Sequence, residues 1–346
     1  MTKKIITDLA LILIIVCAFS RAFAETADNG TLREETRQML HTAVQIKAWG
    51  DNAAPAMAAA FAEMDRVNKL LNNYDNASEI SAINRNAGGQ AVAVSPETME
   101  ALQAADKYAR LSGGAHDVTV GPLVKLWGFA KDKPGLPGAQ PTAAQIKKAK
   151  ELVDYRALEL VDRVENGTPV RTARLAKAGM CIDMGSISKG YCADRAIAVL
   201  KKFGVTGALV ASGGTICTIG HKPDGTPWKV AVRHPRKDDD FMTFVPLVDA
   251  SISTSGDYER FYKKNGKRVS HIFDPRTGRP VEGMQSSSVI AKTGLETDSL
   301  DTTLFVLGPK KGKALIDKLP GTAALLITAD GKIVMTKGWP EKIVIY

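Results

Sequence analysis

Two acidic residues and a threonine near the C-terminal end have a spacing that suits a cation site. Asp298, Asp301 and Thr302 stand at positions i, i+3 and i+4, so in a helix their side chains share one face. Mg²⁺ takes oxygen ligands, uses one or two carboxylates and leaves positions for water and phosphates. The apolar run that follows predicts a helix that ends at Gly308 and is stopped by Pro309. The alternative is an ordinary helix start, where the helix dipole favours acids.

A second polar block precedes another predicted helix, which runs to Phe203 and has Gly204 as its C-terminal glycine. Ser186 is the predicted N-cap of this helix. Free N–H groups at a helix start, the helix dipole and the nearby Lys189 would together favour an anion such as phosphate. A plain cap with a solvated lysine is the other interpretation.

A histidine lies beside a turn late in the chain. Asp274, Pro275 and Gly278 have the chemistry of a turn, which would hold His271 in a fixed place. Histidine is the side chain best suited to moving a proton near neutral pH, so His271 is a candidate for proton transfer. A packed structural histidine is the alternative.

Three further residues suggest contacts with a ligand. Tyr74 is the one aromatic residue in a polar loop, so it either stacks on a planar ligand or covers the end of the preceding helix. His116 and Asp117 form a pair just before an apolar run, and such a pair in a turn is more often structural than catalytic.

The elements that would position these residues alternate between helices and short strands. Apolar residues at helical spacing predict a helix over residues 53–71, and Ser95 followed by Pro96 predicts the start of another. A further helix is expected over residues 142–152. Strands are predicted at 42–47, 208–211, 215–219, 228–233, 244–248, 269–273, 288–292, 323–328 and 332–336, with hairpin turns at Asn265-Gly266 and Asp330-Gly331. The order predicts an α+β fold with mainly antiparallel sheets and flanking helices.

The first 24 residues resemble an export signal. Lys3 and Lys4 precede an apolar run, and Ala22-Phe23-Ala24 has the form of a signal-peptidase site, so cleavage after Ala24 and an exported domain over residues 25–346 are expected. An uncleaved membrane anchor is the alternative.

The formal net charge of +9 suits an anionic ligand or partner. Nucleic acid is not expected as that partner, because the basic residues are scattered, aromatics make up only 6% and no binding motif occurs. The cysteines outside the signal, Cys181, Cys192 and Cys217, are odd in number and lack metal-ligand spacing, which favours buried thiols over a disulfide framework.

Six blocks, in this order and spacing, resemble the FAD:protein FMN transferase (ApbE-like) family. They are GAHDVTVGPLVKLWGFA, IDMGSISKGYCADRA, LVASGGTICTIG, SISTSGDYERFY, SHIFDPRTGRP and ETDSLDTTLFVLG. The resemblance covers nearly the whole chain after the signal. It implies a periplasmic or membrane-surface enzyme that binds FAD and Mg²⁺, attaches FMN through a phosphoester to a Thr or Ser hydroxyl of a partner protein, and releases AMP. The partner expected is a membrane-associated redox protein.

The resemblance also implies roles for individual residues. The metal ligands would be Ser186, Asp298, Asp301 and Thr302, and His271 would be the general base for the acceptor hydroxyl. The FAD contacts would be Met39, Tyr74, Ala115, His116, Asp117, Asp183, Lys189 and Phe273. This sequence departs from the family pattern around Met39, at His116, where an apolar residue is usual, and at Ser188, where several members have Ala.

Two other functions stay open on the sequence. Water in place of the acceptor hydroxyl would make the protein an FAD pyrophosphatase that yields FMN and AMP. A non-catalytic flavin-binding protein is also conceivable, although a binder would have no need of the acidic cluster.

Overall fold

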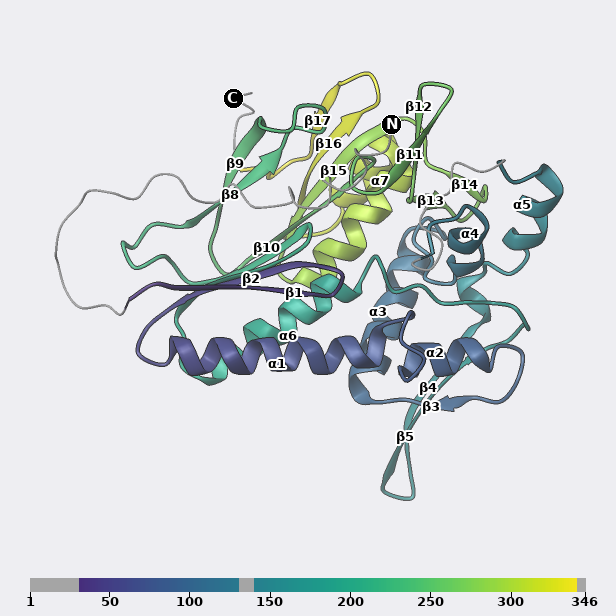
Figure 1. The fold of residues 1–346 in the computed structure, drawn as a ribbon, viewed down its shortest axis with the longest axis horizontal. Coiled ribbons are helices and arrows are strands. Elements are labelled where there is room, and N and C mark those ends of the chain that lie inside the picture. Colours follow the sequence, from purple (N-terminus) through teal and green to yellow (C-terminus); the bar gives the residue numbers. More distant parts are fainter. Residues whose placement is uncertain (1–30, 131–139, 341–346) are drawn as a thin grey trace, which may run out of the picture.

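An eight-stranded antiparallel sheet forms the centre of the fold (Figure 1). The computed structural model describes residues 31–130 and 140–340. The strand order is β1-β2-β6-β7-β10-β15-β16-β17, and each neighbouring pair is antiparallel. The strands are β1 (Arg33–Met39), β2 (Thr42–Trp49), β6 (Gly207–Ser212), β7 (Thr215–Ile219), β10 (Ser251–Gly256), β15 (Met284–Ala291), β16 (Ala323–Thr328) and β17 (Ile333–Met335). The predicted α+β class with antiparallel sheets is confirmed.

Three helices cover one face of this sheet. They are α1 (Ala53–Leu71), α6 (Ser188–Lys202) and α7 (Gly294–Ile316). Helix α7 packs on β10, β15 and β16, while α6 packs on β6 and β7 and lies between α1 and α7. The predicted inner side of α1 is buried, with Met57, Phe61, Met64, Val67 and Leu71 in the largest hydrophobic cluster. Burial of such side chains contributes about 1.5–3 kcal/mol each, which fixes the helices on the sheet.

A hairpin covers the opposite face. Strands β8 (Trp228–Arg233) and β9 (Phe241–Leu247) pair with each other and place Trp228, Val230 and Val245 against apolar side chains of the sheet. The sheet is therefore buried on both sides, and most residues of its central strands β6, β7, β10 and β15 are buried, including most of the serines of β10 and β15.

The shorter elements lie beside the helices (Figure 1). They are α2 (Glu79–Arg85), α3 (Pro96–Leu111), α4 (Gly121–Leu126), α5 (Ala143–Lys150), the 3₁₀ turn η1 (Tyr155–Ala157) and the strands β3 (Val92–Ala93), β4 (Leu158–Glu165) and β5 (Thr168–Leu175). The β4–β5 hairpin projects from the body and turns at Asn166 and Gly167. Two further hairpins follow β10: β11 (Phe261–Lys264) with β12 (Lys267–Ser270), and β13 (Phe273–Asp274) with β14 (Arg279–Pro280).

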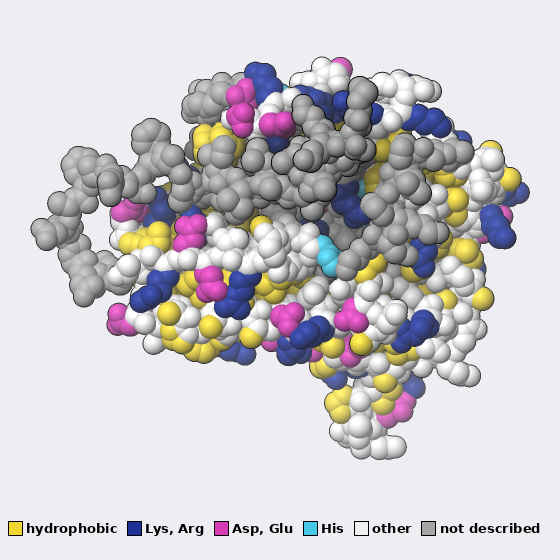
Figure 2. Space-filling view, viewed as in Figure 1, with side chains coloured by type: hydrophobic (Ala, Val, Ile, Leu, Met, Phe, Trp, Pro, Cys, Tyr) yellow, Lys and Arg dark blue, Asp and Glu magenta, His cyan; other side chains and the backbone are white. Residues whose placement is uncertain are grey.

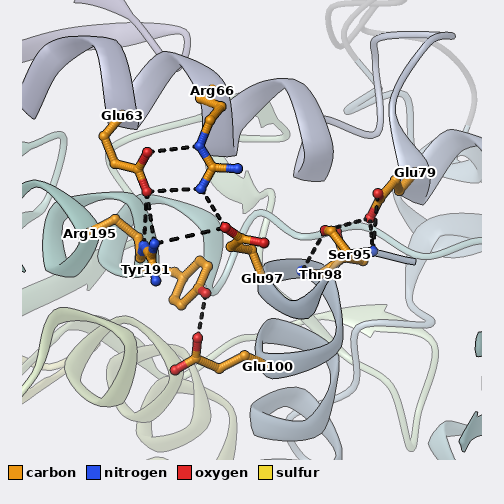
Figure 3. Close-up of polar contacts among 9 residues, drawn as sticks. All are labelled: Glu63, Arg66, Glu79, Ser95, Glu97, Thr98, Glu100, Tyr191 and Arg195. Carbon is orange, nitrogen blue, oxygen red and sulfur yellow. Dashed lines mark hydrogen bonds and ion pairs between the residues drawn. The ribbon is translucent and has the colours of Figure 1, made fainter. Parts of the chain in front are cut away.

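An ion-pair network joins α1, α3 and α6 (Figure 3). Glu63 of α1 accepts hydrogen bonds from Arg66 and from Arg195 of α6, and Arg66 also pairs with Glu97 at the start of α3. The hydrogen bond from Arg66 lowers the pKa of Glu63, so this carboxylate is ionised at neutral pH. The network therefore ties α6, which carries Lys189, to its two neighbouring helices.

Several sequence predictions are confirmed in detail. Ser95 caps α3 by accepting a hydrogen bond from the Thr98 N–H, and the predicted helix at residues 142–152 is α5 with Thr142 as its cap. The turns at Asn265-Gly266 and at residues 330–331 join paired strands. The cysteines Cys181, Cys192 and Cys217 are buried and free.

Three predictions differ from the structure. Ser186 does not cap a helix, because α6 begins at Ser188 with Ile187 at its N-cap and no capping side chain. Gly308 ends a helical segment with a φ of 73°, as expected, but Pro309 starts a second segment instead of stopping the helix. The first predicted strand begins at Thr42, but the structure has another strand before it, β1, which is mostly exposed and pairs with β2 along its whole length.

The predicted signal peptide, cleaved after Ala24, lies outside the described residues. Across residues 31–130 and 140–340, no helix has the length and apolar character needed to cross a membrane.

Candidate active site

Two glycines let the N-terminal ends of α6 and α7 touch. A Cβ atom added to Gly190 would overlap the carbonyl group of Gly294, and one added to Gly294 would lie 2.6 Å from the carbonyl oxygen of Gly190. The N–H of Gly190 donates to a carboxylate oxygen of Asp298 at 2.9 Å. This close crossing places Lys189, the residue before Gly190, with its Nζ 3.7 Å from the other oxygen of Asp298.

A buried aspartate strengthens the same crossing. The carboxylate of Asp194 in α6 accepts hydrogen bonds from the N–H groups of Gly294 and Leu295, at 2.6 and 2.8 Å. These are the first N–H groups of α7, which have no partner within the helix. Asp194 therefore fixes the helix end from which Asp298, Asp301 and Thr302 project.

The predicted cation-site residues lie together on α7. Asp298 and Asp301 are both buried, and the Ser255 hydroxyl donates to Asp301 at 2.9 Å and lies 3.0 Å from the Thr302 hydroxyl. Burial, and then the negative charge of Asp298, raises the pKa of Asp301 to about 8. The charge of Asp298 therefore opposes the ionisation of Asp301, and a bound cation would relieve this repulsion.

The donor set fits Mg²⁺ better than a transition metal. The described residues contain no cluster of three or more His, Cys, Asp or Glu side chains that would hold a metal ion. Two carboxylates with a hydroxyl supply only hard oxygen donors, and Mg²⁺ is commonly held by one or two carboxylates, with its other positions left to water and phosphate.

Ser186, the remaining predicted metal ligand, contacts a histidine. The Nε2 atom of His116 lies 3.0 Å from the Ser186 hydroxyl, and the imidazole is fully buried beside Tyr108. Burial lowers the pKa of His116 to about 4, so the ring is neutral at physiological pH. His116 therefore holds the loop before α6 in position from the protein interior. The family pattern has an apolar residue at this position, and the contact with Ser186 accounts for a polar one here.

Asp183 connects three of the predicted flavin-binding segments. Its N–H donates to the Val118 carbonyl at 2.7 Å, one carboxylate oxygen accepts the Gly185 N–H at 2.8 Å, and the other lies 3.5 Å from the Tyr74 hydroxyl. Tyr74 is half-buried and meets the ring of His41 edge-on, in the turn that follows Met39. The structure thus brings Met39, Tyr74 and Asp183 into one region.

Other predicted flavin contacts point into the protein. The Asp117 carboxylate accepts hydrogen bonds from both the N–H and the hydroxyl of Thr119 and from the N–H of Tyr155. Ala115 is buried, and the Phe273 ring packs against Trp127 and Phe129. These side chains shape the site from within, and their contact with FAD stays a prediction.

The orientation of His271 is set by the backbone of Arg260. Both the N–H and the Nδ1 atom of His271 lie near the Arg260 carbonyl oxygen, at 3.0 and 3.1 Å. A carbonyl only accepts hydrogen bonds, so Nδ1 carries the proton and the lone pair of Nε2 is free to accept another. The surrounding protein, and then the charge of Arg260, lowers the pKa of His271 to about 3. The ring is therefore in its basic form at neutral pH.

Charges link the separate parts of the site. The positive charge of Lys189 acts on both Asp301 and His271, and that of Arg260 acts on both Tyr74 and His271. The acidic pair, the candidate base and the aromatic loop therefore each lie within electrostatic range of at least one of these two cations. Such an arrangement suits a reaction at a phosphate group, which needs positive charge and positioning more than covalent chemistry from the protein.

Sequence reasoning missed several contributors to this site, among them Arg260, Ser255 and Gly190. Arg260 is one residue in a polar stretch, and only the hairpin that follows it shows that its carbonyl faces His271. Ser255 lies on β10, and Gly190 sits inside a helix where glycine is unfavourable. The glycine was the one detectable signal, because a glycine inside a predicted helix often marks close packing.

The comparisons with known proteins agree with this geometry. The ApbE family profile matches residues 40–326. A Salmonella typhimurium protein named FAD:protein FMN transferase is 34% identical over 272 residues, covering 78% of this chain and 76% of that protein. The Escherichia coli K12 protein of the same name is 32% identical, covering 81% and 78%.

Solved structures give the same result. The crystal structure of the ApbE protein from Thermotoga maritima superposes with a TM-score of 0.81 and 30% identity, covering 90% of this chain and all of that one. The apo form of the Pseudomonas stutzeri flavinyl transferase ApbE gives a TM-score of 0.77 at 30% identity, covering 89% and 95%.

Proposed function

Since the chain belongs to the ApbE family, a family of flavin transferases, we propose that it moves FMN from FAD to a Thr or Ser hydroxyl of a partner protein. In this reaction the hydroxyl oxygen forms a bond to the FMN phosphorus, the pyrophosphate bond breaks, and AMP leaves. The observation that carries the proposal is His271, whose Nδ1 is held by the Arg260 carbonyl and whose ring feels the charge of Lys189, the cation that lies 3.7 Å from Asp298 of α7.

His271 is the general base in this proposal. Its Nε2 accepts the proton of the acceptor hydroxyl as the oxygen attacks phosphorus, while the Arg260 carbonyl keeps Nδ1 protonated. The low pKa of His271 keeps the ring ready to accept a proton across the neutral range.

Asp298, Asp301 and Thr302 hold Mg²⁺, with Ser186 contributing from the loop before α6. When bound, Mg²⁺ supplies positive charge at the pyrophosphate and stabilises the AMP leaving group. Lys189 adds a second positive charge, and Asp194 keeps the start of α7 in place while these groups act.

The flavin end is assigned to the region around Tyr74. Tyr74, Asp183 and the turn after Met39 lie together. In this proposal the ring of Tyr74 stacks on the planar flavin. Ala115, His116, Asp117 and Phe273 support this region through the backbone and packing.

The place of action is the periplasm or its membrane surface. Residues 1–24 contain a charged segment, then an apolar run and then small residues. This order supports export with cleavage after Ala24. An acceptor on a membrane-associated redox protein would meet the enzyme there.

One experiment separates this function from its alternatives. The protein is incubated with FAD, Mg²⁺ and a membrane extract of its host, and proteins and nucleotides are then analysed by mass spectrometry. A protein that gains the mass of FMN, together with AMP, supports the transferase. Free FMN and AMP without a modified protein would indicate a pyrophosphatase, and unchanged FAD would indicate a binding protein.

A further inference from the structure

The β11–β12 hairpin carries an unusual concentration of positive charge. Residues 261–270, FYKKNGKRVS, include Lys263, Lys264, Lys267 and Arg268 and no acidic residue. Lys263 and Lys267 are exposed, and Lys264 is partly exposed. In the space-filling view, Lys and Arg side chains appear over this end of the molecule, at the top (Figure 2).

The pairing within the hairpin is unfavourable on its own. Lys264 and Lys267 stand directly opposite each other across the two strands. Like charges in such a pair destabilise a sheet, and a two-stranded hairpin has little stability to spare. Arg268 faces Asp257 at 3.6 Å, but none of the three lysines forms an ion pair with a residue that the structure describes.

The hairpin leads directly into the candidate active site. Arg260 precedes β11 and His271 follows β12, and the hydrogen bond from the His271 N–H to the Arg260 carbonyl closes the base of the hairpin. Each strand has four residues, so the lysines lie within roughly 13 Å of the candidate base.

We propose that the β11–β12 hairpin is the docking surface for an acidic segment of the acceptor protein. This inference rests on the proposed function. The acidic side chains lie between the three lysines and relieve their repulsion, and this contact directs a nearby hydroxyl to His271. An extended chain covers the distance from the hairpin tip to its base in about four residues, so the acids lie about four positions from the modified hydroxyl.

A protein segment fits this surface better than a lipid membrane does. Proteins that bind membrane surfaces combine basic side chains with apolar ones that enter the lipid. The hairpin tip is instead formed by Asn265 and Gly266, and its exposed aromatic residue, Phe261, lies at the base, where the Arg268 guanidinium covers the ring at 4.7 Å. The surface thus offers charge without an apolar tip.

The test compares two charge-neutralised variants of the full chain. Lys263→Gln/Lys264→Gln/Lys267→Gln removes the hairpin charges, and Lys201→Gln/Lys202→Gln removes exposed charges from the far end of α6. The probe is a fluorescent peptide with one Thr and several Glu residues about four positions from it, and a matched peptide has Gln in place of Glu. Binding is measured by anisotropy in the presence of FAD and Mg²⁺ at low and high salt.

We expect the native chain and the α6 variant to bind the Glu peptide equally, with an affinity that falls as salt rises. The hairpin variant should bind about tenfold more weakly, since it lacks three charge contacts, and should melt at or above the native temperature because the lysine repulsion is gone.

Equal binding by the hairpin variant, or equal binding of the Glu and Gln peptides by the native chain, would overturn the proposal. So would hairpin-dependent sedimentation with phosphatidylglycerol vesicles in place of peptide binding, because the partner would then be a lipid surface. FAD affinity is measured in the same variants. If hairpin-dependent docking occurs but the native chain modifies no protein, the proposed function fails and the docking surface remains.

Discussion

At the scale of single residues, the site depends on contacts that fix protons and charges. His271 suits its proposed role as a base because the Arg260 carbonyl selects one tautomer, and because the surrounding protein and the neighbouring cations keep the ring neutral. Asp301 shows the opposite effect, since burial and Asp298 raise its pKa to about 8. The same small region therefore holds an imidazole that resists protonation and a carboxyl that resists ionisation.

Replacing His271 tests whether this residue acts in catalysis or in ligand binding. In His271→Ala we expect flavin transfer to slow by about 10² to 10⁴-fold, as for the loss of a general base. FAD affinity, measured by flavin fluorescence, should stay nearly unchanged. An equal loss of affinity and rate would instead mean that His271 holds the ligand.

The charge of Arg260 should appear in the pH profile. A base works only above its pKa, so with saturating Mg²⁺ the acid limb that His271 contributes to the native profile should lie below pH 5. In Arg260→Gln the backbone carbonyl remains and the charge is lost, so the pKa of His271 should rise and the rate should begin to fall at higher pH. An unshifted profile would assign Arg260 a packing role through its hydrogen bond to Phe129 alone.

At the scale of elements, the crossing of α6 and α7 is the feature on which the site depends. The two helices approach closely because Gly190 and Gly294 face each other, and Asp194 and Asp298 each accept N–H groups from the opposite helix. The geometry of the candidate site thus follows from packing between two helix starts.

A single methyl group tests this crossing. Gly190→Ala would place a Cβ atom against the Gly294 carbonyl, and overpacking of this kind costs about 2 kcal/mol. We expect a lower melting temperature and a higher Mg²⁺ requirement, because Lys189 and Asp298 move apart. The control is Gly312→Ala, because the three atoms nearest to the added methyl all belong to Leu304 and lie at 3.3 Å or more. Equal melting of the two variants would contradict this account of the crossing.

The network of α1, α3 and α6 predicts a sensitivity to acid. The folded-state pKa of Glu63 lies below its ordinary value of 4.5, so its contribution to stability is present above that value and is lost as pH falls further. Arg66→Gln should therefore lower the stability by roughly 1 kcal/mol at pH 7. Thermal melts should show a smaller difference at pH 4, and a difference that grows toward acid would disprove the assignment.

At the scale of the whole molecule, the features that depend on neighbouring residues were predicted from the sequence, and those that depend on contacts between distant segments were not. The bounds of α1, the Ser95 cap and the hairpin turns depend on neighbouring residues, and each is confirmed. The eight-stranded order, strand β1 and the Gly190–Gly294 contact depend on pairings between distant segments, which no local pattern carries. The face shared by Asp298, Asp301 and Thr302 was predictable from helical spacing, whereas the Arg260 carbonyl behind His271 was not.

If the α7 cluster holds Mg²⁺ for flavin transfer, the loss of one carboxylate should change the Mg²⁺ requirement, and a Mg²⁺ titration of Asp298→Asn measures this. Asparagine keeps the shape and an acceptor for the Gly190 N–H but removes the charge. We predict a melting temperature near that of the native protein, a much higher Mg²⁺ requirement, and transfer at a small fraction of the native rate with FAD saturating. A variant that is less stable yet transfers FMN at the native rate with an unchanged Mg²⁺ requirement would contradict the account, and the cluster would then be a helix-end feature.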